Sequence, residues 1–231
     1  MRKRQKAGNF MSRVHIAPSI LAADLAHLAE TCTLIDGSAD LLHLDVMDGR
    51  FAPNFTIGPD IIAAIRRSTS LPLDVHLMVE EPEPFLPLFR DAGADRIAVH
   101  WEACANPVQT LGKIRKLGAW SGIALKVDTS VDVLEDLLDI VDYIVILSVD
   151  LEPGRKTFRP VAFEKVRRAA ALRGNRSRPL IEVDGGISLE TAALFRTAGG
   201  DILVAGSAVF GADDPVAAIH MLRDSQAKSE K

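Results

Sequence analysis

Eight short stretches rich in apolar and β-branched residues alternate with segments of helical periodicity, and this alternation constrains the fold more than any other feature of the chain. We predict strands at 15–19, 41–45, 73–78, 96–100, 122–127, 143–149, 180–184 and 202–206. We predict helices between them at 25–35, 59–68, 83–92, 108–117, 131–138, 163–171, 189–198 and 215–225. Such alternation predicts a parallel sheet, and eight units are typical of an α/β chain closed into a single (β/α)8 TIM barrel. An open doubly wound sheet would favour fewer units and a glycine-rich fingerprint after the first strand, which this chain lacks.

Several predicted helices begin at residues that cap helices well. The side-chain oxygens of Asp24, Ser130, Ser188 and Asp214 can accept hydrogen bonds from the first free backbone N–H groups, and Pro215 suits a first-turn position. These residues support the predicted helix boundaries.

Length and composition fit one catalytic domain. The chain has 231 residues, of which 48% are hydrophobic, and we place the barrel at 12–226. We interpret 1–11 as a flexible basic extension and 227–231 as a polar tail. A start codon assigned upstream of Met11 is an alternative explanation for the extension.

Charge and cysteine content argue against several kinds of partner. The net charge of -4 gives no general attraction to nucleic acid or to an anionic membrane. No apolar run approaches the ~20 residues that a membrane helix needs. Cys32 and Cys104 are far apart and form neither a metal-binding spacing nor a disulfide framework, which is typical of a reducing compartment. We therefore expect a soluble cytoplasmic protein.

Ionisable side chains occupy the predicted strands at positions that face the interior. His43 and Asp45 share one face of the second strand, because side chains two residues apart in a strand point the same way. His76 lies in the third strand and Asp184 ends the seventh. Burying such groups is costly unless they bind something or one another. Since the carboxyl ends of barrel strands converge on the active site, we expect these residues to meet there with Ser19.

Each of these residues taken alone also has an ordinary explanation. A strand-end histidine such as His76 is more often a hydrogen-bonded structural residue, and Asp45 or Asp184 can cap the following loop. Two imidazoles beside two carboxylates, however, form a donor set that suits Zn, Fe, Mn or Co better than Mg or Ca. We therefore predict one divalent metal ion bound by His43, Asp45, His76 and Asp184.

Neighbouring residues receive simpler interpretations. Asp48 precedes a glycine and is assigned to a turn, while Met47 and Met78 would line the site as a polarizable wall. Glu182 shares the face of Asp184 and is expected deeper in the barrel as a paired acid, with Lys126 as a possible partner. His100 and Glu102, which end the fourth strand, fit the rim of the site and an ordinary surface role equally well.

Two glycine turns follow the last two predicted strands. Gly185 and Gly186 follow the seventh strand, and Gly206 and Ser207 follow the eighth. Barrels often bind phosphate at these loops, because glycine lets backbone N–H groups approach the anion. Tight turns alone would also explain the glycines. We predict a phosphorylated substrate at these residues.

Five segments resemble the ribulose-phosphate 3-epimerase family: APSILAADLA (17–26), HLDVMDGRFAPN (43–54), DVHLMV (74–79), IEVDGGI (181–187) and DILVAGSAVF (201–210). The resemblance runs from about Val14 to the final helix. It implies a barrel of the ribulose-phosphate-binding type and a metal-dependent isomerase of the pentose phosphate pathway. Such an enzyme inverts C3 of D-ribulose 5-phosphate to give D-xylulose 5-phosphate.

The resemblance also implies residue roles. Asp45 and Asp184 would be the catalytic acid/base pair that transfers protons through an enediolate, and the metal ligands would be His43, Asp45, His76 and Asp184. Family members are commonly homo-oligomers. The implied substrate-binding residues are Ser19, His76, Gly154, Gly185, Gly186, Gly206 and Ser207.

The chain departs from the family pattern most in one loop, and also at Lys126, Val127 and Leu147. Residues 149–158 read VDLEPGRKTF where the family has a flap resembling VNPGFGGQKF, so Glu152 and Arg155 stand at glycine positions. Charge contact by Arg155 or Lys156 is an alternative to backbone binding of the phosphate there. Lys126 also stands where the family has asparagine. These differences concern the substrate more than the reaction, since all four predicted ligands are present.

Other functions therefore stay open. One is a sister epimerase that acts on another ketose phosphate, and another is a non-catalytic barrel that binds a sugar phosphate. A third is a phosphate-binding decarboxylase on a similar barrel. That class would show Asp-x-Lys-x-x-Asp at a strand end, whereas residues 45–49 contain no lysine.

Overall fold

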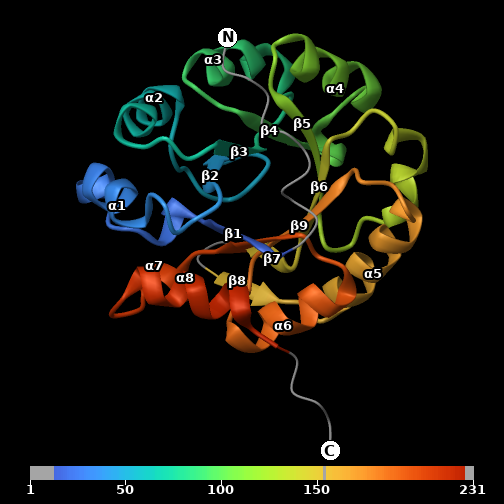
Figure 1. Ribbon diagram of the computed structural model, residues 1–231. Coiled ribbons are helices and arrows are strands. Elements are labelled where there is room, and N and C mark those ends of the chain that lie inside the picture. The colour runs from blue at the N-terminus through green and yellow to red at the C-terminus, as the bar shows by residue number, and fades with distance from the viewer. Residues whose placement is uncertain (1–12, 153–154, 227–231) are drawn as a thin grey trace, which may run out of the picture.

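Eight parallel strands form a ring at the centre of the molecule, seen along the barrel axis in Figure 1. The structure is a computed structural model that describes residues 13–152 and 155–226. The strands are β1 (His15–Pro18), β2 (Leu42–Met47), β3 (Leu73–Met78), β4 (Arg96–His100), β5 (Trp120–Leu125), β6 (Tyr143–Leu147), β9 (Leu180–Asp184) and β10 (Ile202–Ala205). They pair in the order β1-β10-β9-β6-β5-β4-β3-β2, and a bridge between Ser19 and His43 joins β2 back to β1. The predicted (β/α)8 barrel is confirmed.

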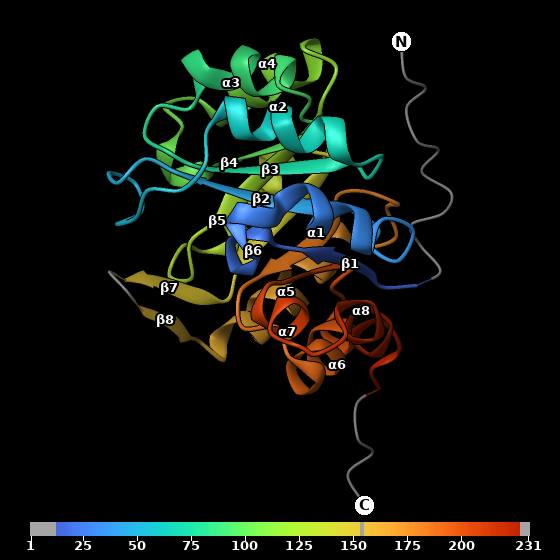
Figure 2. The ribbon, with the colours of Figure 1, turned by 90° about the vertical axis from the view of Figure 1, so that its left-hand side faces the viewer.

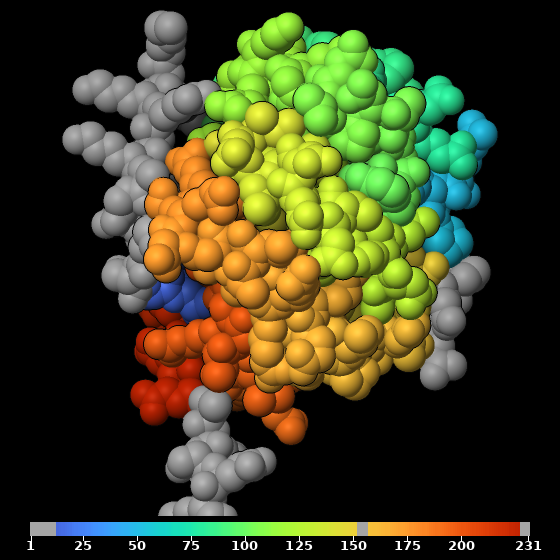
Figure 3. All heavy atoms as spheres, turned by 90° about the vertical axis from the view of Figure 1, so that its right-hand side faces the viewer, coloured from blue at the N-terminus to red at the C-terminus, as the bar shows by residue number. Residues whose placement is uncertain are grey.

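Helices cover the outside of the ring. Figure 3 shows the outer surface on one side of the molecule, which is formed by segments coloured green to orange. The α-helices are α1 (Leu28–Ile35), α2 (Pro59–Ser68), α3 (Leu86–Asp91), α4 (Pro107–Lys116), α5 (Val161–Arg173), α6 (Leu189–Ala198), α7 (Ser207–Phe210) and α8 (Pro215–Asp224). Short 3₁₀ helices are η2 (Ile20–Ala22), η3 (Leu25–His27), η4 (Glu83–Phe85), η5 (Trp101–Ala103) and η6 (Val131–Leu137).

The predicted caps begin helices as expected. The side chains of Asp24, Ser130, Ser188 and Asp214 each accept a hydrogen bond from a backbone N–H in the first turn. The helices predicted at 25–35 and 83–92 begin with a 3₁₀ turn, and the one predicted at 131–138 is 3₁₀ throughout. The caps thus located the helix starts, but the type of helix depends on packing that the local sequence does not specify.

An antiparallel hairpin, formed by β7 (Val149–Glu152) and β8 (Arg155–Phe158), was not predicted. It projects from the end of the barrel at which the parallel strands finish, at the lower left of Figure 2. The strand predicted at 143–149 stops at Leu147. The N–H of Ser148 makes the last bond of the β6–β9 pairing, to the carbonyl of Asp184 at 2.8 Å, before the chain enters β7. Gly154, a predicted substrate-binding residue, lies outside the described residues.

Strand side chains alternate between two apolar layers. Outward residues such as Leu44 and Val75 pack beneath the helices, whereas inward residues such as Ala17 and Val145 fill the barrel. Tyr143 fills the space beside Gly122, where an added Cβ would lie 2.4 Å from the ring carbon Cζ. The barrel interior is therefore a packed core on which polar groups stand out.

The predicted extension at 1–11 and the tail at 227–231 lie outside the described residues. Cys32 is buried and Cys104 is partly buried, and both are free thiols. Within 13–152 and 155–226, no helix combines the length and the apolar character needed to cross a membrane.

Candidate metal centre and active site

Four ionisable side chains from three strands meet inside the barrel. His43 and Asp45 lie on the inward face of β2, and His76 on β3 pairs in register with Asp45. Asp184 ends β9, which is separated from β2 by β1 and β10. No member of the group is more than 9% exposed. The structure therefore brings together all four residues that were predicted as metal ligands.

The ligand atoms of these residues have the spacing that a metal ion requires. Asp45 Oδ1 lies 3.3 Å from His43 Nε2 and 3.5 Å from His76 Nδ1. Asp184 Oδ2 lies 3.3 Å from His76 Nδ1 and 3.9 Å from His43 Nε2. Ligands held at about 2.0–2.1 Å from a tetrahedral ion are roughly 3.4 Å apart. The four residues thus fit a single divalent ion.

The hydrogen bonding of the cluster supports the same conclusion. Among the residues that the structure describes, His43 Nε2, Asp45 Oδ1 and His76 Nδ1 are buried and make no hydrogen bond of normal geometry. Buried polar atoms are nearly always paired, because leaving one unpaired costs free energy. Three such atoms pointing at one another therefore mark a site for a ligand.

The charges of the cluster depend on one another. Burial acts to lower the pKa of His43, but neighbouring carboxylates, led by Asp45, raise it well above its ordinary value. Burial opposes the same change at His76, whose pKa is nevertheless raised to about 9 by Asp184 and Asp45. The imidazoles hold the pKa of Asp45 well below its usual range against the effect of burial. Protons on the histidines therefore balance the carboxylates, and a bound cation would displace them.

The open side of the cluster combines one hydroxyl with an apolar wall. Ser19 Oγ donates to Asp45 Oδ2 at 2.9 Å, so the predicted substrate-binding serine touches a predicted catalytic carboxylate. Met47 and Met78 form an apolar group that also contains Ala52, Leu21, Phe51 and Leu151. This wall contributes no charged donor or acceptor, which leaves the polar chemistry to the four ligands and Ser19.

The two glycine turns lie on neighbouring strands, since β9 and β10 pair in parallel. Gly185 has φ +104° and Gly186 has φ +58°, a region that favours glycine. A Cβ on Gly186 would lie 2.5 Å from Cδ2 of Phe158 in the hairpin, so packing alone also requires a glycine there. Gly206 caps the short helix α7, and Ser207 begins it. The turns therefore form adjacent parts of one rim.

A second charged cluster lies one layer deeper, and its cation was not predicted. Arg96 Nη2 lies 2.7 Å from Glu182 Oε2, and Arg96 Nε lies 3.1 Å from Asp74 Oδ1. The guanidinium carbon lies 3.9 Å from the centre of the Tyr143 ring. Glu182 is therefore a paired acid, but the interpretation of Lys126 as its partner is wrong. One signal in the sequence could have predicted this arginine. Arg96 lies two and four residues before Ala98 and His100, so all three side chains point into the barrel.

His100 and Glu102 lie behind His76 rather than at an unrelated surface. His100 Nε2 is 3.0 Å from His76 Nε2, and His100 Nδ1 is 3.1 Å from Glu102 Oε2. Burial lowers the pKa of His100 to about 4 against the opposing effect of Glu102. Of the two interpretations left open for this pair, the structure favours the one at the site.

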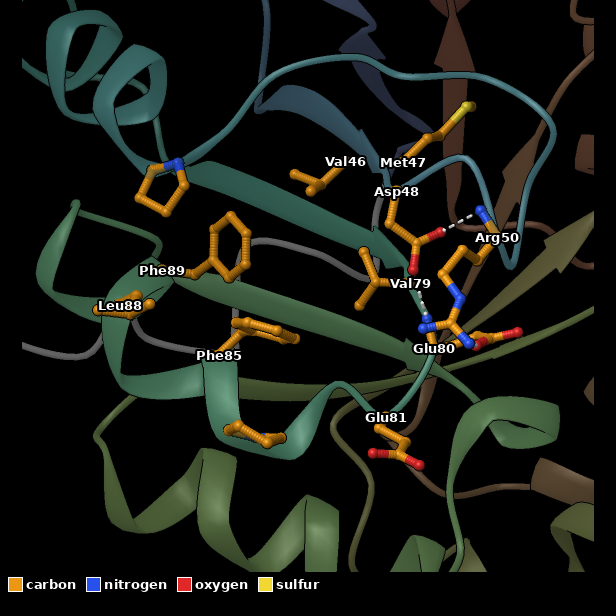
Figure 4. Close-up of a pocket in the computed structure, with 12 residues that line it drawn as sticks. Val46, Met47, Asp48, Arg50, Val79, Glu80, Glu81, Phe85, Leu88 and Phe89 are labelled. Atoms are coloured by element: carbon orange, nitrogen blue, oxygen red, sulfur yellow. Dashed lines mark hydrogen bonds and ion pairs between the residues drawn. The ribbon is translucent and has the colours of Figure 1, made fainter.

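A separate cavity of about 610 Å³ is lined by the end of β2, by the loops after β2 and β3, and by residues of α2, η4 and α3. Figure 4 shows Val46, Val79 and Phe89 around it. At its edge Asp48 accepts hydrogen bonds from the N–H groups of Arg50 at 2.9 Å and Glu80 at 2.8 Å, as expected of a turn residue. None of the four predicted ligands lines this cavity, so it is not part of the metal cluster.

Solved structures share this fold at low sequence identity. KGPDC from Streptococcus mutans has a TM-score of 0.68 and 16% identity, with 93% of this chain and 97% of that chain covered. A 3-hexulose-6-phosphate synthase has a TM-score of 0.63 and 19% identity, with 93% and 100% covered. At these identities the similarity demonstrates a shared barrel only.

Sequence relatives are much more similar. Ribulose-phosphate 3-epimerase of Bacillus subtilis is 43% identical over 216 residues, which cover 92% of this chain and 100% of the relative. The Chlamydia muridarum protein of the same name is 48% identical over 206 residues, with 87% and 90% covered. The model of the ribulose-phosphate 3 epimerase family matches residues 15–210, a range that contains all four predicted ligands. This chain therefore belongs to the ribulose-phosphate 3-epimerase family.

Proposed function

We propose that this protein is a metal-dependent epimerase that inverts C3 of D-ribulose 5-phosphate to give D-xylulose 5-phosphate. The observation that carries the proposal is the buried convergence of two carboxylates and two imidazoles at one point of the barrel. We infer the identity of the substrate from the name shared by relatives at 43–48% identity. The mixed nitrogen and oxygen ligands favour Zn, Fe, Mn or Co.

The two carboxylates suit the chemistry of epimerisation. Inversion removes a proton from one face of C3 and returns a proton to the other face, so two acids serve better than one. Asp45 and Asp184 come from strands on different parts of the ring, and we assign them alternating roles as base and acid on either side of an enediolate. Both carboxylates lie near the same two imidazoles, His43 and His76, so a proton carried by either acid has these rings within reach.

The remaining parts of the site have supporting roles. Ser19 holds the Asp45 carboxylate in place through its hydrogen bond and reaches the substrate together with His76. A divalent ion bound by the four ligands would act as a Lewis acid towards the negative charge that develops on the substrate. The methionine wall contains no donor that would compete for that charge.

We assign the phosphate group to the rim formed by the loops after β9 and β10. The two strands are paired, and Gly186 and Ser207 are exposed at their ends, where backbone N–H groups can approach an anion. The binding residues in this proposal are Gly154, Gly185, Gly186, Gly206 and Ser207. We further propose that the protein acts in the cytoplasm as a homo-oligomer.

A deuterium-exchange assay tests the activity. The metal-loaded protein is incubated in D₂O with ribulose 5-phosphate and, separately, with other ketose phosphates, and NMR follows the hydrogen on C3. We expect exchange and inversion with ribulose 5-phosphate. Exchange only with another ketose phosphate would indicate the sister epimerase, and binding without exchange would indicate a sugar-phosphate sensor. Release of CO₂ from a phosphosugar acid would indicate a decarboxylase.

A further inference from the structure

The hydrogen bonds of Glu102 determine where His100 carries its proton. Glu102 Oε1 accepts from the backbone N–H of Lys126 at 2.8 Å and from the hydroxyl of Thr129, while Oε2 lies 3.1 Å from His100 Nδ1. An ionised carboxylate can only accept hydrogen bonds. His100 Nδ1 must therefore be the protonated nitrogen of that ring.

The proton position on His100 in turn determines the proton position on His76. His100 is 0% exposed, and the ring of Phe51 lies 4.6 Å from its own. A fully buried imidazole next to a cation site is most stable when neutral, so His100 Nε2 keeps a lone pair and accepts. His76 Nε2, at 3.0 Å, must then donate. When a metal ion replaces the second proton of His76, its Nδ1 then presents a lone pair on the side of Asp45 and Asp184.

We propose that Glu102 and His100 are positioning residues for the metal centre: Glu102, acting through His100, holds His76 in the Nε2–H tautomer, whose Nδ1 is free to bind the ion. This inference rests on the metal binding in the proposed function and not on the identity of the substrate. It also connects the metal centre to the loop after β5, because Lys126 and Thr129 bind the same carboxylate.

Replacing Glu102 with glutamine tests the proposal, because the change should reverse the tautomers. In Glu102→Gln the amide oxygen must face the N–H of Lys126, so the amide NH₂ faces His100 Nδ1. His100 then carries its proton on Nε2, which makes His76 Nε2 the acceptor and places a proton on His76 Nδ1. We expect the Kd for zinc to rise about 10- to 100-fold, measured by competition with a chelator. ¹⁵N NMR of the histidine rings should show His100 changing from the Nδ1–H to the Nε2–H tautomer.

Thr129→Val provides the matched control. It removes a hydrogen bond to the same carboxylate but leaves the contact of Glu102 with His100 intact, so we expect the wild-type Kd and tautomers. Equal losses of zinc affinity in both variants would mean that Glu102 only anchors the loop and would overturn the proposal. An unchanged Kd or unchanged tautomers in Glu102→Gln would also overturn it, as would a wild-type protein without zinc affinity. A wild type that binds zinc but epimerises no ketose phosphate would refute the proposed activity alone.

Discussion

Two charge clusters occupy successive layers of the barrel interior, and they differ in the source of their positive charge. In the lower cluster, the permanently charged guanidinium of Arg96 lies between Asp74 and Glu182. In the upper cluster, Asp45 and Asp184 face imidazoles that are charged only when protonated. The lower cluster carries its own cation, whereas the upper one needs protons or a metal ion.

His43 belongs to both clusters and shows what this difference means. Its Nδ1 lies 3.0 Å from Asp74 Oδ2, and its Nε2 faces Asp45. Asp74 is held by Arg96 and can orient the ring, while Asp45 has no such fixed cation and stays available for the ligand and base roles proposed above. In the proposed function, a buried carboxylate is thus structural where a fixed cation neutralises it and reactive where only titratable groups do.

Removing a carboxylate from the upper cluster should have the largest effect. We expect Asp45→Asn and Asp184→Asn each to lower kcat by at least about 10³-fold, because each removes a proton-transfer group and a ligand. Epimerisation is measured by NMR with ribulose 5-phosphate. Thermal unfolding in the presence of a chelator serves as the control for folding. Near-normal activity in both variants would remove the distinction between the two clusters.

Removing the cation of the lower cluster should instead destabilise the fold. In Arg96→Met, Asp74 and Glu182 lose their permanently charged buried partner and keep only His43, and we expect a loss of about 3–5 kcal/mol in the free energy of unfolding. Urea denaturation with chelator measures it, and Arg96→Lys should recover part of the loss. Asp45→Asn should cost less, because the imidazoles left behind can release their protons. Equal losses in Arg96→Met and Asp45→Asn would contradict the comparison.

Metal binding to the upper cluster should depend on pH. The pKa of His76 is raised to about 9, so its imidazole is protonated at neutral pH in the ion-free protein and must lose that proton to bind a metal. We expect the Kd for zinc to fall up to about tenfold per pH unit for each proton released, between roughly pH 6 and 8. Calorimetry in buffers of different ionisation enthalpy counts the protons. A Kd that is constant with pH would show that the histidines are neutral before binding.

The same shift predicts the opposite trend for the stability of the chelated protein. A raised histidine pKa contributes stability that is fully present below the ordinary value of about 6.5 and is lost as pH rises through about 9. The melting temperature in chelator should therefore decrease over this window. In His76→Gln the side chain cannot titrate, so the melting temperature should decrease less with pH. If the melting temperature depends on pH equally in both proteins, groups other than His76 cause the decrease.

The smallest effect is expected at Ser19. Ser19→Ala removes one hydrogen bond to Asp45 without removing a ligand, and we expect about a tenfold loss in kcat. Ser121→Ala is the matched control, since this buried serine bonds to Asp142 and Ile140, away from the cluster. A larger loss in Ser121→Ala than in Ser19→Ala would show that packing, not the contact with Asp45, controls the rate.

Local chemistry was enough to predict much of this protein. Strand parity placed His43 and Asp45 on one face, and the caps at Ser188 and Asp214 located helix starts. Both properties depend on a few neighbouring residues, so they can be read along the chain. The recurrence of eight strands then indicated a barrel, and barrel geometry indicated which strand ends meet.

Only the tertiary structure decided how the buried charges are paired. Arg96 meets Glu182 across 86 positions of sequence, and His100 meets His76 across 24, because neighbouring or facing strands bring them together when the ring closes. The hairpin of β7 and β8 likewise lies against the distant turn after β9, where Gly185 is next to Val149 and Gly186 is next to Phe158. In each case several partners were chemically acceptable. The distances within the folded core determine which partners meet. A buried charge without a partner raises the free energy of the fold by more than local sequence preferences can offset.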